Sequence, residues 1–145
     1  MIKIYTDGSC LGNPGNGGWA AIIIEDEKKT SIKGSKKDTT NNQMELRAVI
    51  EGLKILKRPC QVEIFTDSVY VGKGITDWMA KWKSNGWRRR EGKSWKPVKN
   101  VELWQLLDEQ LGRHSVKYTR VAGHSGHPEN ERCDELAVQA YQGRL

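Results

Sequence analysis

The order of strand-like and helix-like segments restricts this chain to few folds. Residues 2–7, 18–25 and 28–36 are strand-like, and the last two are close enough in sequence to pair as antiparallel neighbours. Helical and strand patterns alternate afterwards. The helical patterns cover residues 42–56, short pieces within 68–85, 100–112 and 128–141, and the further strands cover 61–67 and 115–121. This order predicts a mixed α/β sheet covered by helices.

Several residues predict where these segments end. Arg58-Pro59 should end the helix at 42–56, Asn100 should be the N-cap of the next long helix, and Gly112 should stop that helix. Residues 86–99 have no clear period and are expected to be irregular. The chain of 145 residues has no internal repeat, so a single domain over 1–145 is expected.

The composition excludes several classes of protein. No apolar run reaches the roughly 18 residues of a transmembrane helix, and the start MIKIYTDGSC lacks the features of a secretory signal. Three cysteines, odd in number and far apart, argue against a disulfide framework and against a zinc site. These features predict a cytoplasmic protein.

The positive charge is concentrated in one stretch, residues 81–99, which we call the basic segment. It holds eight Lys or Arg residues and one acid, whereas the remainder of this +6 chain is close to neutral. A local block of this kind predicts a polyanionic partner.

Two strands have similar ends, Ile4-Tyr5-Thr6-Asp7 and Ile64-Phe65-Thr66-Asp67. If these strands are parallel neighbours, Asp7 and Asp67 lie together at the carboxyl edge of the sheet, where open α/β folds bind ligands. The alternative is that each aspartate merely ends its strand and caps the next segment.

Two further acids lie near apolar helix faces. Glu45 shares a face of the helix 42–56 with Ala48, Val49 and Leu53, where an unpaired carboxylate is costly. The alternative is a capping box in which Glu45 bonds back to Asn42. Asp134 borders the apolar stripe of the last helix, although an acid near a helix start also suits the helix dipole.

Four carboxylates brought together would repel one another unless cations joined them. Ligand sets made only of oxygen suit Mg²⁺ or Mn²⁺ rather than zinc. Two such ions about 4 Å apart could hold the attacking and leaving oxygens of a phosphodiester.

Four blocks of this sequence resemble those of bacterial type 1 ribonuclease H: YTDGSCLGNPGNGGWA, TTNNQMEL, IFTDSVYV and VAGHSGHPENERCDELA. The similarity spans essentially the whole chain, and the combined spacing is specific. The resemblance implies a ribonuclease H-like α/β fold, with a five-stranded mixed sheet flanked by helices on both faces. It also implies an endonuclease that cuts the RNA strand of RNA–DNA hybrids and leaves 5′-phosphate and 3′-hydroxyl ends.

The resemblance assigns the catalytic acids. Asp7 would bridge two Mg²⁺ ions, Glu45 and Asp67 would complete one site, and Asp134 the other. His124 matches the family's mobile histidine, a proton carrier or a helper in product release. His114 and His127 receive no such role.

The basic segment resembles the protruding basic handle with which bacterial ribonucleases H hold the DNA strand. Aromatic rings interleaved with cations suit sugar and phosphate surfaces, although core packing also explains part of each tryptophan. The residues expected to bind substrate here are Trp78, Trp82, Lys83, Trp87, Arg88, Lys96 and Lys99.

Other positions match the family's contacts to the two strands. Cys10, Asn13, Asn41 and Asn42 match contacts to RNA 2′-hydroxyls, the groups that distinguish RNA from DNA. Thr40, Asn13 and Asn100 match a site for a DNA-strand phosphate. For the glycine-rich residues around Asn13, a plain hairpin turn is nearly as good an interpretation.

Two departures weaken single contacts. Asp38 stands where family members often have a basic residue, and Val69 stands where a glutamine is familiar.

Two other functions remain open at this stage. One is a nuclease of the same broad fold acting on DNA or on junctions, and the other is a binding module without catalysis. The expected partner is an RNA–DNA hybrid, with no membrane and no obligatory protein partner, and the chain is expected to be a monomer.

Overall fold

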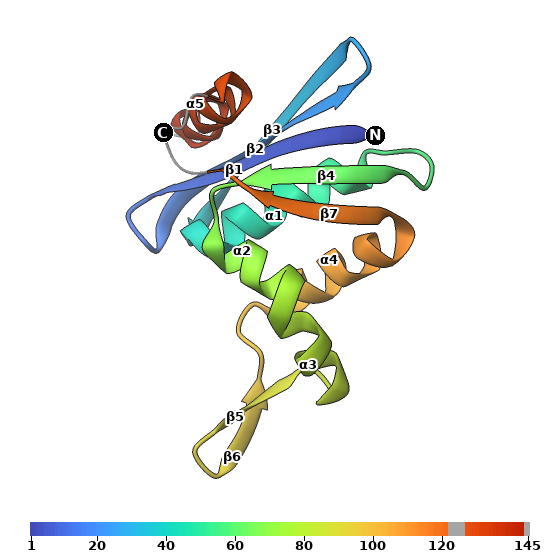
Figure 1. The fold of residues 1–145 in the computed structure, drawn as a ribbon. Coiled ribbons are helices and arrows are strands. Elements are labelled where there is room, and N and C mark those ends of the chain that lie inside the picture. The colour runs from blue at the N-terminus through green and yellow to red at the C-terminus, as the bar shows by residue number, and fades with distance from the viewer. Residues whose placement is uncertain (122–126, 144–145) are drawn as a thin grey trace.

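The fold was obtained as a computed structural model that describes residues 1–121 and 127–143. Its main sheet has the strand order β3-β2-β1-β4-β7 (Figure 1). The elements in chain order are β1 (Ile2–Leu11), β2 (Gly15–Glu25), β3 (Lys28–Thr39), α1 (Asn41–Lys54), β4 (Gln61–Thr66), α2 (Val69–Lys73), the π-helix η1 (Gly74–Trp78), α3 (Met79–Ser84), β5 (Arg88–Glu91), β6 (Ser94–Pro97), α4 (Val101–Arg113), β7 (Ser115–Arg120) and α5 (Pro128–Gln142).

The main sheet is mixed, as expected. β2 pairs antiparallel with β1 and β3, whereas β4 pairs parallel with β1 and β7. The strands β1, β4 and β7 therefore end at the same edge of the sheet. Figure 1 shows α1 and α5 on opposite sides of the strands, which confirms the expected α/β fold with helices on both faces.

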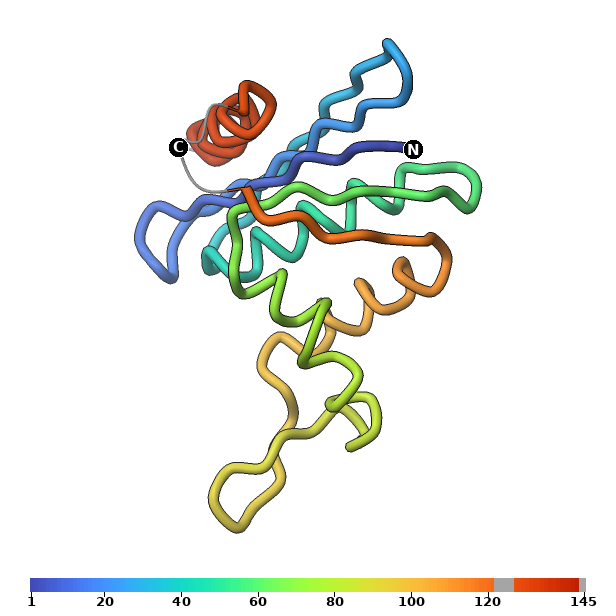
Figure 2. The backbone as a smooth tube through the Cα atoms, in the orientation of Figure 1, coloured from blue at the N-terminus to red at the C-terminus, as the bar shows by residue number. Residues whose placement is uncertain are grey.

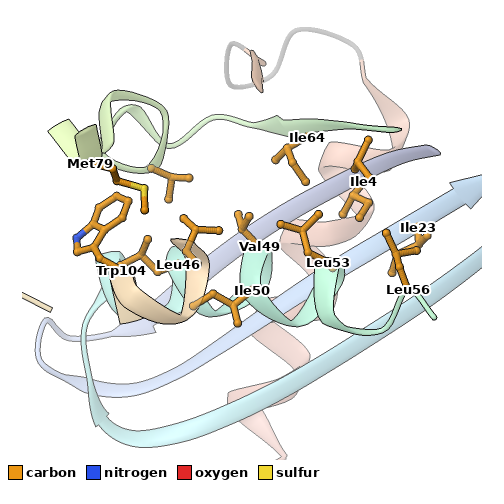
Figure 3. Packing of buried hydrophobic residues seen from close by; sticks show 14 of the residues in the cluster. Ile4, Ile23, Leu46, Val49, Ile50, Leu53, Leu56, Ile64, Met79 and Trp104 are labelled. Atoms are coloured by element: carbon orange, nitrogen blue, oxygen red, sulfur yellow. The ribbon is translucent and has the colours of Figure 1, made fainter. Parts of the chain in front are cut away.

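Alternate residues of each central strand enter two separate cores. Ile4, Ile23 and Ile64 pack with α1 in the larger core, which extends to Trp104 of α4 (Figure 3). The smaller core lies on the other face, where Tyr5 and Phe65 pack with Cys133 and other residues of α5. This period of two is what a strand covered on both faces requires.

Helix α1 anchors the larger core. Thr40 is its N-cap, because the Thr40 side chain accepts a hydrogen bond from the Gln43 backbone N–H. The capping box with Asn42 is therefore wrong. One face of the helix is buried, and each fully buried large aliphatic side chain contributes about 1.5–3 kcal/mol; that face includes Leu46, Val49, Ile50 and Leu53.

The turn after the first strand is shorter than the sequence predicts. β1 continues past Asp7 to Leu11, and β2 begins at Gly15. The glycines of this stretch suggested a turn, yet their backbone groups pair across the hairpin up to Leu11 opposite Asn16. The expectation that Asp7 ends its strand is wrong for this reason.

Two other segments differ from expectation. The basic segment contains an exposed hairpin of β5 and β6, which projects away from the main sheet (Figure 2).

Gly112 does not stop α4, which continues to Arg113. The His114 backbone N–H donates to the Gln110 carbonyl and closes the last turn, so the glycine remains helical. Asn100 does occupy the N-cap position, but its side chain makes no capping bond.

The helical segment after β4 bends without breaking. It runs as α2, η1 and α3 in direct succession, whereas separate short pieces were expected within residues 68–85. A Cβ at Gly74 would lie 1.9 Å from the Trp104 ring. The glycine thus allows close packing of this segment on α4.

The three cysteines are free thiols, in agreement with the absence of a disulfide framework. Within residues 1–121 and 127–143, no helix has both the length and the apolar character needed to cross a membrane.

Candidate metal centre and nucleic-acid interface

The acidic site forms where two parallel strands separate. β1 and β4 pair only as far as Tyr5 opposite Phe65. Beyond that point β4 ends at Thr66, whereas β1 continues along β2 alone. Asp7 and Asp67 follow directly, so the expectation that both lie at one edge of the sheet is confirmed.

Glu45 reaches this edge from α1. The backbone N–H of Gly8 donates to Glu45 Oε1 over 3.0 Å and to Asp7 Oδ1 over 2.9 Å. A Cβ at Gly8 would lie 2.5 Å from the Glu45 backbone nitrogen, so only glycine permits this approach of β1 to α1. Gly8 is thus a site residue whose backbone role the sequence did not reveal.

Three carboxylates share one small space. Asp7, Glu45 and Asp67 each offer an oxygen, and these oxygens lie within 4.8 Å of one another. Asp7 and Glu45 are buried, and the second oxygen of Glu45, Oε2, has no hydrogen-bond partner in the described chain. A buried carboxylate oxygen without a donor is costly. A divalent cation would satisfy it, and ligands made only of oxygen suit a hard cation.

Burial and mutual repulsion disfavour ionisation of these groups. Burial, followed by the charges of Asp67 and Asp134, raises the pKa of Asp7 to about 7. The pKa of Glu45 lies well above its ordinary value, because the group is buried and faces Asp7. Burial and the nearby Asp134 raise the pKa of Asp67. The cluster therefore favours added positive charge.

Asp134 approaches from the opposite face of the sheet. It is exposed on α5, whose buried side packs in the smaller core through Cys133, Leu136 and Ala137. It lies near enough to raise the pKa of Asp7 and of Asp67, but it is outside the group of three with oxygens within 4.8 Å. All four predicted acids thus gather at one edge.

The three histidines differ in position. His124 lies outside the described residues. His127 packs beside the rings of Tyr5 and Phe65, with ring centroids 6.3 and 6.5 Å away. His114 Nδ1 accepts a hydrogen bond from the backbone N–H of Cys60, on another part of the fold.

The predicted RNA-side residues come together beside the acids. Asn13 Oδ1 accepts a 3.1 Å hydrogen bond from the Asn41 backbone N–H, which ties the first hairpin turn to the start of α1. Asn41 and Asn42 are exposed there. The Cys10 thiol donates to the Thr39 carbonyl, over 3.2 Å.

A hydrogen-bonded chain links this area to the predicted DNA-side residue Asn100. Gln43 accepts from the Thr39 hydroxyl at 2.8 Å and donates to Asn100 Oδ1 at 3.1 Å. Asn100 in turn donates to the Tyr70 hydroxyl at 3.1 Å. The sequence did not single out Gln43 or Tyr70, since a helical glutamine and a partly buried tyrosine carry no local signal of such a link.

Three tryptophan rings form a continuous row, which we call the aromatic row: Trp78 of η1, Trp82 of α3 and Trp104 of α4. Trp78 and Trp82 lie 5.6 Å apart, and Trp82 lies 5.2 Å from Trp104, measured between ring centroids. A groove of about 310 Å³ adjoins these rings and is lined by Tyr70, Trp78, Trp82, Arg89, Val98 and Lys99.

The predicted cations of the basic segment fall into two groups. Arg88, Lys96 and Lys99 are exposed. Lys83 forms an ion pair with Asp108 at 3.1 Å, so part of its charge is already compensated. Trp87 is partly buried against the larger core, so the packing interpretation holds for that residue.

Comparison with known proteins gives consistent results. A family model described as RNase H matches residues 1–142. The chain is 56% identical over 146 residues to Ribonuclease H of Rhodopirellula baltica, covering 99% of this chain and 92% of that protein. It is 55% identical over 147 residues to Ribonuclease H of Bordetella bronchiseptica, covering 99% and 93%.

Two solved structures share the fold. The crystal structure of LC9-RNase H1, a type 1 RNase H with the type 2 active-site motif, matches with a TM-score of 0.85 and 32% identity, covering 99% of this chain and 73% of that one. LC11-RNase H1, solved in complex with an RNA/DNA hybrid, matches with a TM-score of 0.74 and 22% identity, covering 100% and 99%.

Proposed function

Because the chain belongs to the ribonuclease H family, we propose that it is an endonuclease that hydrolyses the RNA strand of RNA–DNA hybrids and leaves 5′-phosphate and 3′-hydroxyl ends. The observation that carries the proposal is the group of three carboxylates with oxygens within 4.8 Å of one another. It lies at an open sheet edge beside exposed asparagines. A phosphodiester can approach this edge, whereas a closed pocket would exclude a duplex.

The acids are proposed to hold two divalent cations, with Mg²⁺ as the physiological ion and Mn²⁺ as a substitute. Asp7 would serve both positions, because Glu45 and Asp67 adjoin it on one side and Asp134 on the other. Cations held in this way stabilise the charge that develops on the attacking and leaving oxygens. His124 is proposed to carry a proton during turnover.

RNA recognition is assigned to the turn and helix start beside the acids. Asn41 and Asn42 offer amide donors and acceptors at the surface, and Asn13 and Cys10 adjoin them. Such groups can bind 2′-hydroxyls across a minor groove.

The DNA strand is assigned to residues that lead from this turn and helix start to Asn100 and the basic segment. Asn13, Thr40 and Asn100 are proposed to bind one of its phosphates. The basic segment continues this path through the aromatic row and three exposed cations, Arg88, Lys96 and Lys99. Lys83 and Trp87 are secondary candidates because each already has a partner within the protein.

For the whole molecule we propose one catalytic domain over residues 1–145, acting as a monomer in the cytoplasm without an obligatory protein partner. The free thiols fit a reducing compartment.

The test is cleavage of a strand-labelled RNA–DNA hybrid with Mg²⁺ and with chelator, alongside single-stranded RNA, duplex RNA and duplex DNA. We expect metal-dependent cuts confined to the hybrid's RNA strand, with 5′-phosphate ends identified by phosphatase sensitivity. Cutting of DNA would point to a nuclease with another substrate, and binding without cutting would point to a non-catalytic module.

A further inference from the structure

Arg120 lies at the acidic edge of the sheet. It is the last residue of β7 and pairs with Thr66, the last residue of β4, which Asp67 follows. Because β1, β4 and β7 are parallel neighbours, Asp7, Asp67 and Arg120 lie at one edge of the sheet, in or directly after successive strands. A cation therefore adjoins the carboxylate cluster.

Arg120 and Asp134 flank the cluster from opposite faces of the sheet. Val121 is buried in the smaller core, under α5. Successive side chains along a strand point to opposite faces of the sheet, so Arg120 points away from the smaller core and shares a face with Tyr118. The Tyr118 ring packs against Gly72 of α2, which has no side chain in the way. Arg120 thus lies on the side where the chain leaves Asp67 for α2.

The guanidinium of Arg120 has no partner among the residues that the structure describes. Six other arginines make ion pairs or hydrogen bonds, namely Arg47, Arg58, Arg89, Arg90, Arg113 and Arg132. Within residues 1–121 and 127–143, exposed Arg120 makes neither with its side chain. Its charge lowers the pKa of Asp67, but no ion pair joins the two.

This position fits an anion that approaches the acids. For cleavage, the RNA strand has to cross the carboxylates, and its next phosphate then lies beside the cut linkage. Val69, two residues after Asp67, is 44% exposed, and its side chain offers that strand no hydrogen bond. An arginine fork matches the oxygens of a phosphate.

We propose that Arg120 binds the RNA-strand phosphate next to the cut linkage, on the side of the acids away from Asn41 and Asn42. This inference rests on the proposed hydrolysis of hybrids. The strand would then be held on both sides of the acids, by the asparagines on one side and by the guanidinium on the other.

The simplest test compares Arg120→Ala and Arg120→Lys with Lys117→Ala, which removes a charge from the same strand at an exposed position away from the acids. Steady-state cleavage of the labelled hybrid should show the KM of Arg120→Ala raised about tenfold, as expected when one charge-assisted hydrogen bond is removed. The salt dependence of binding should fall by about 0.9 in slope, the value for one neutralised phosphate. Arg120→Lys should recover part of the affinity, and Lys117→Ala should stay within twofold of wild type.

A second measurement identifies the phosphate. A series of hybrids carries one uncharged methylphosphonate each, at successive positions of the RNA strand, and the nucleotide at that position is a deoxynucleotide. The control for each hybrid has the same deoxynucleotide with a normal phosphate. At one position next to the cut, the difference between wild type and Arg120→Ala should disappear.

Other outcomes overturn the inference in separable ways. If the KM of Arg120→Ala stays raised at every methylphosphonate position while the Mg²⁺ concentration for half-maximal cleavage changes, Arg120 only offsets the negative charge of the acids. Equal KM values for all variants would also refute it. If wild type itself fails to cut the hybrid, the proposed function fails instead.

Discussion

Gln43 Nε2 donates a hydrogen bond to Asn100 Oδ1 over 3.1 Å, which joins the first turn of α1 to the residue that precedes α4. Asn100 has a left-handed backbone conformation, with φ of 59°, and its side chain also donates to Tyr70. Asparagine tolerates this conformation better than most residues. Both polar atoms of its side-chain amide, Oδ1 and Nδ2, are therefore hydrogen-bonded, which fixes the orientation of the amide at the predicted DNA-strand site.

Replacing Gln43 by leucine should loosen that arrangement. Gln43→Leu removes a partner of Asn100 and of Thr39, so we expect the free energy of unfolding to fall by about 1 kcal/mol. KM for the hybrid should rise while kcat is kept, because the acids are not touched. Denaturant unfolding and steady-state cleavage measure the two effects. Gln105→Leu, at an exposed position of α4, is the matched control, and equal KM values for both variants would contradict the positioning role.

Asp7→Asn should separate catalysis from binding. The substitution removes one charge from the cluster but keeps the shape of the side chain. We expect cleavage to fall at least ~100-fold, on the scale seen when one transition-state interaction is removed, while hybrid affinity is retained. Asp26→Asn, at an exposed turn, should cut normally. A wild-type rate for Asp7→Asn would show that the site is wrongly assigned.

The metal-free protein should lose stability as the pH rises. The pKa of Asp7 is about 7 in the folded protein against an ordinary 3.8. The folded state therefore holds its proton more tightly than the unfolded state, and ionisation on going from about pH 4 to pH 7 costs stability. Calorimetry in chelator should show a lower Tm at pH 8 than at pH 5.

Mg²⁺ provides the counterpart of that measurement. It should raise the Tm more at pH 8 than at pH 5, because the carboxylates bind it in their ionised form. Asp7→Asn should reduce the pH effect in chelator. An unchanged pH profile in the variant would mean that other groups cause the fall.

The exposed cations of the basic segment should contribute to affinity. Arg88→Ala with Lys96→Ala removes two charges, so the hybrid should bind more weakly and the salt slope should fall by about 0.9 for each phosphate that is no longer neutralised. The double variant Lys54→Ala with Lys57→Ala removes the same charge on another part of the surface and is the control. Fluorescence anisotropy over a salt series measures both, and identical slopes would exclude this surface as a binding site.

The two glycines Gly8 and Gly112 should respond in opposite ways to alanine. Gly112→Ala introduces a methyl group into open space within α4, so the free energy of unfolding should rise by about 0.5–1 kcal/mol. Gly8→Ala forces contact with the backbone of α1 and should cost about 1–3 kcal/mol, with loss of activity. Thermal unfolding compares them, and a destabilised Gly112→Ala would contradict the continuous helix.

Local patterns located the strands of the main sheet but not how these strands pair. The similar ends at Asp7 and Asp67 predicted a common edge only on the condition that the two strands are parallel neighbours, and the joint role of all four acids followed from the family resemblance. Local patterns also could not show how far β1 extends, since glycines that pair across a hairpin look like a turn. The strands β5 and β6 also lack the apolar alternation of a buried sheet, because both are exposed on all sides.

The interactions that join distant segments could not be predicted from local patterns. The contact of Gly8 with Glu45 and that of Gln43 with Asn100 each connect residues far apart in sequence. Nothing in the residues around Gln43 indicates its partner. For Asp134, the helix pattern correctly indicated the border of the apolar face, but not that the acid approaches the others from the opposite side of the sheet.

The separation of the two cores has a consequence for partial unfolding. Asp7, Glu45 and Asp67 belong to β1, α1 and the end of β4, whereas Asp134 depends on the packing of α5 in the smaller core. Opening of α5 alone would withdraw Asp134 while the other three acids stay in place, and such local events require less free energy than global unfolding. Heat inactivation could then precede melting of the sheet, so that catalytic activity reports the attachment of one helix rather than the integrity of the whole fold.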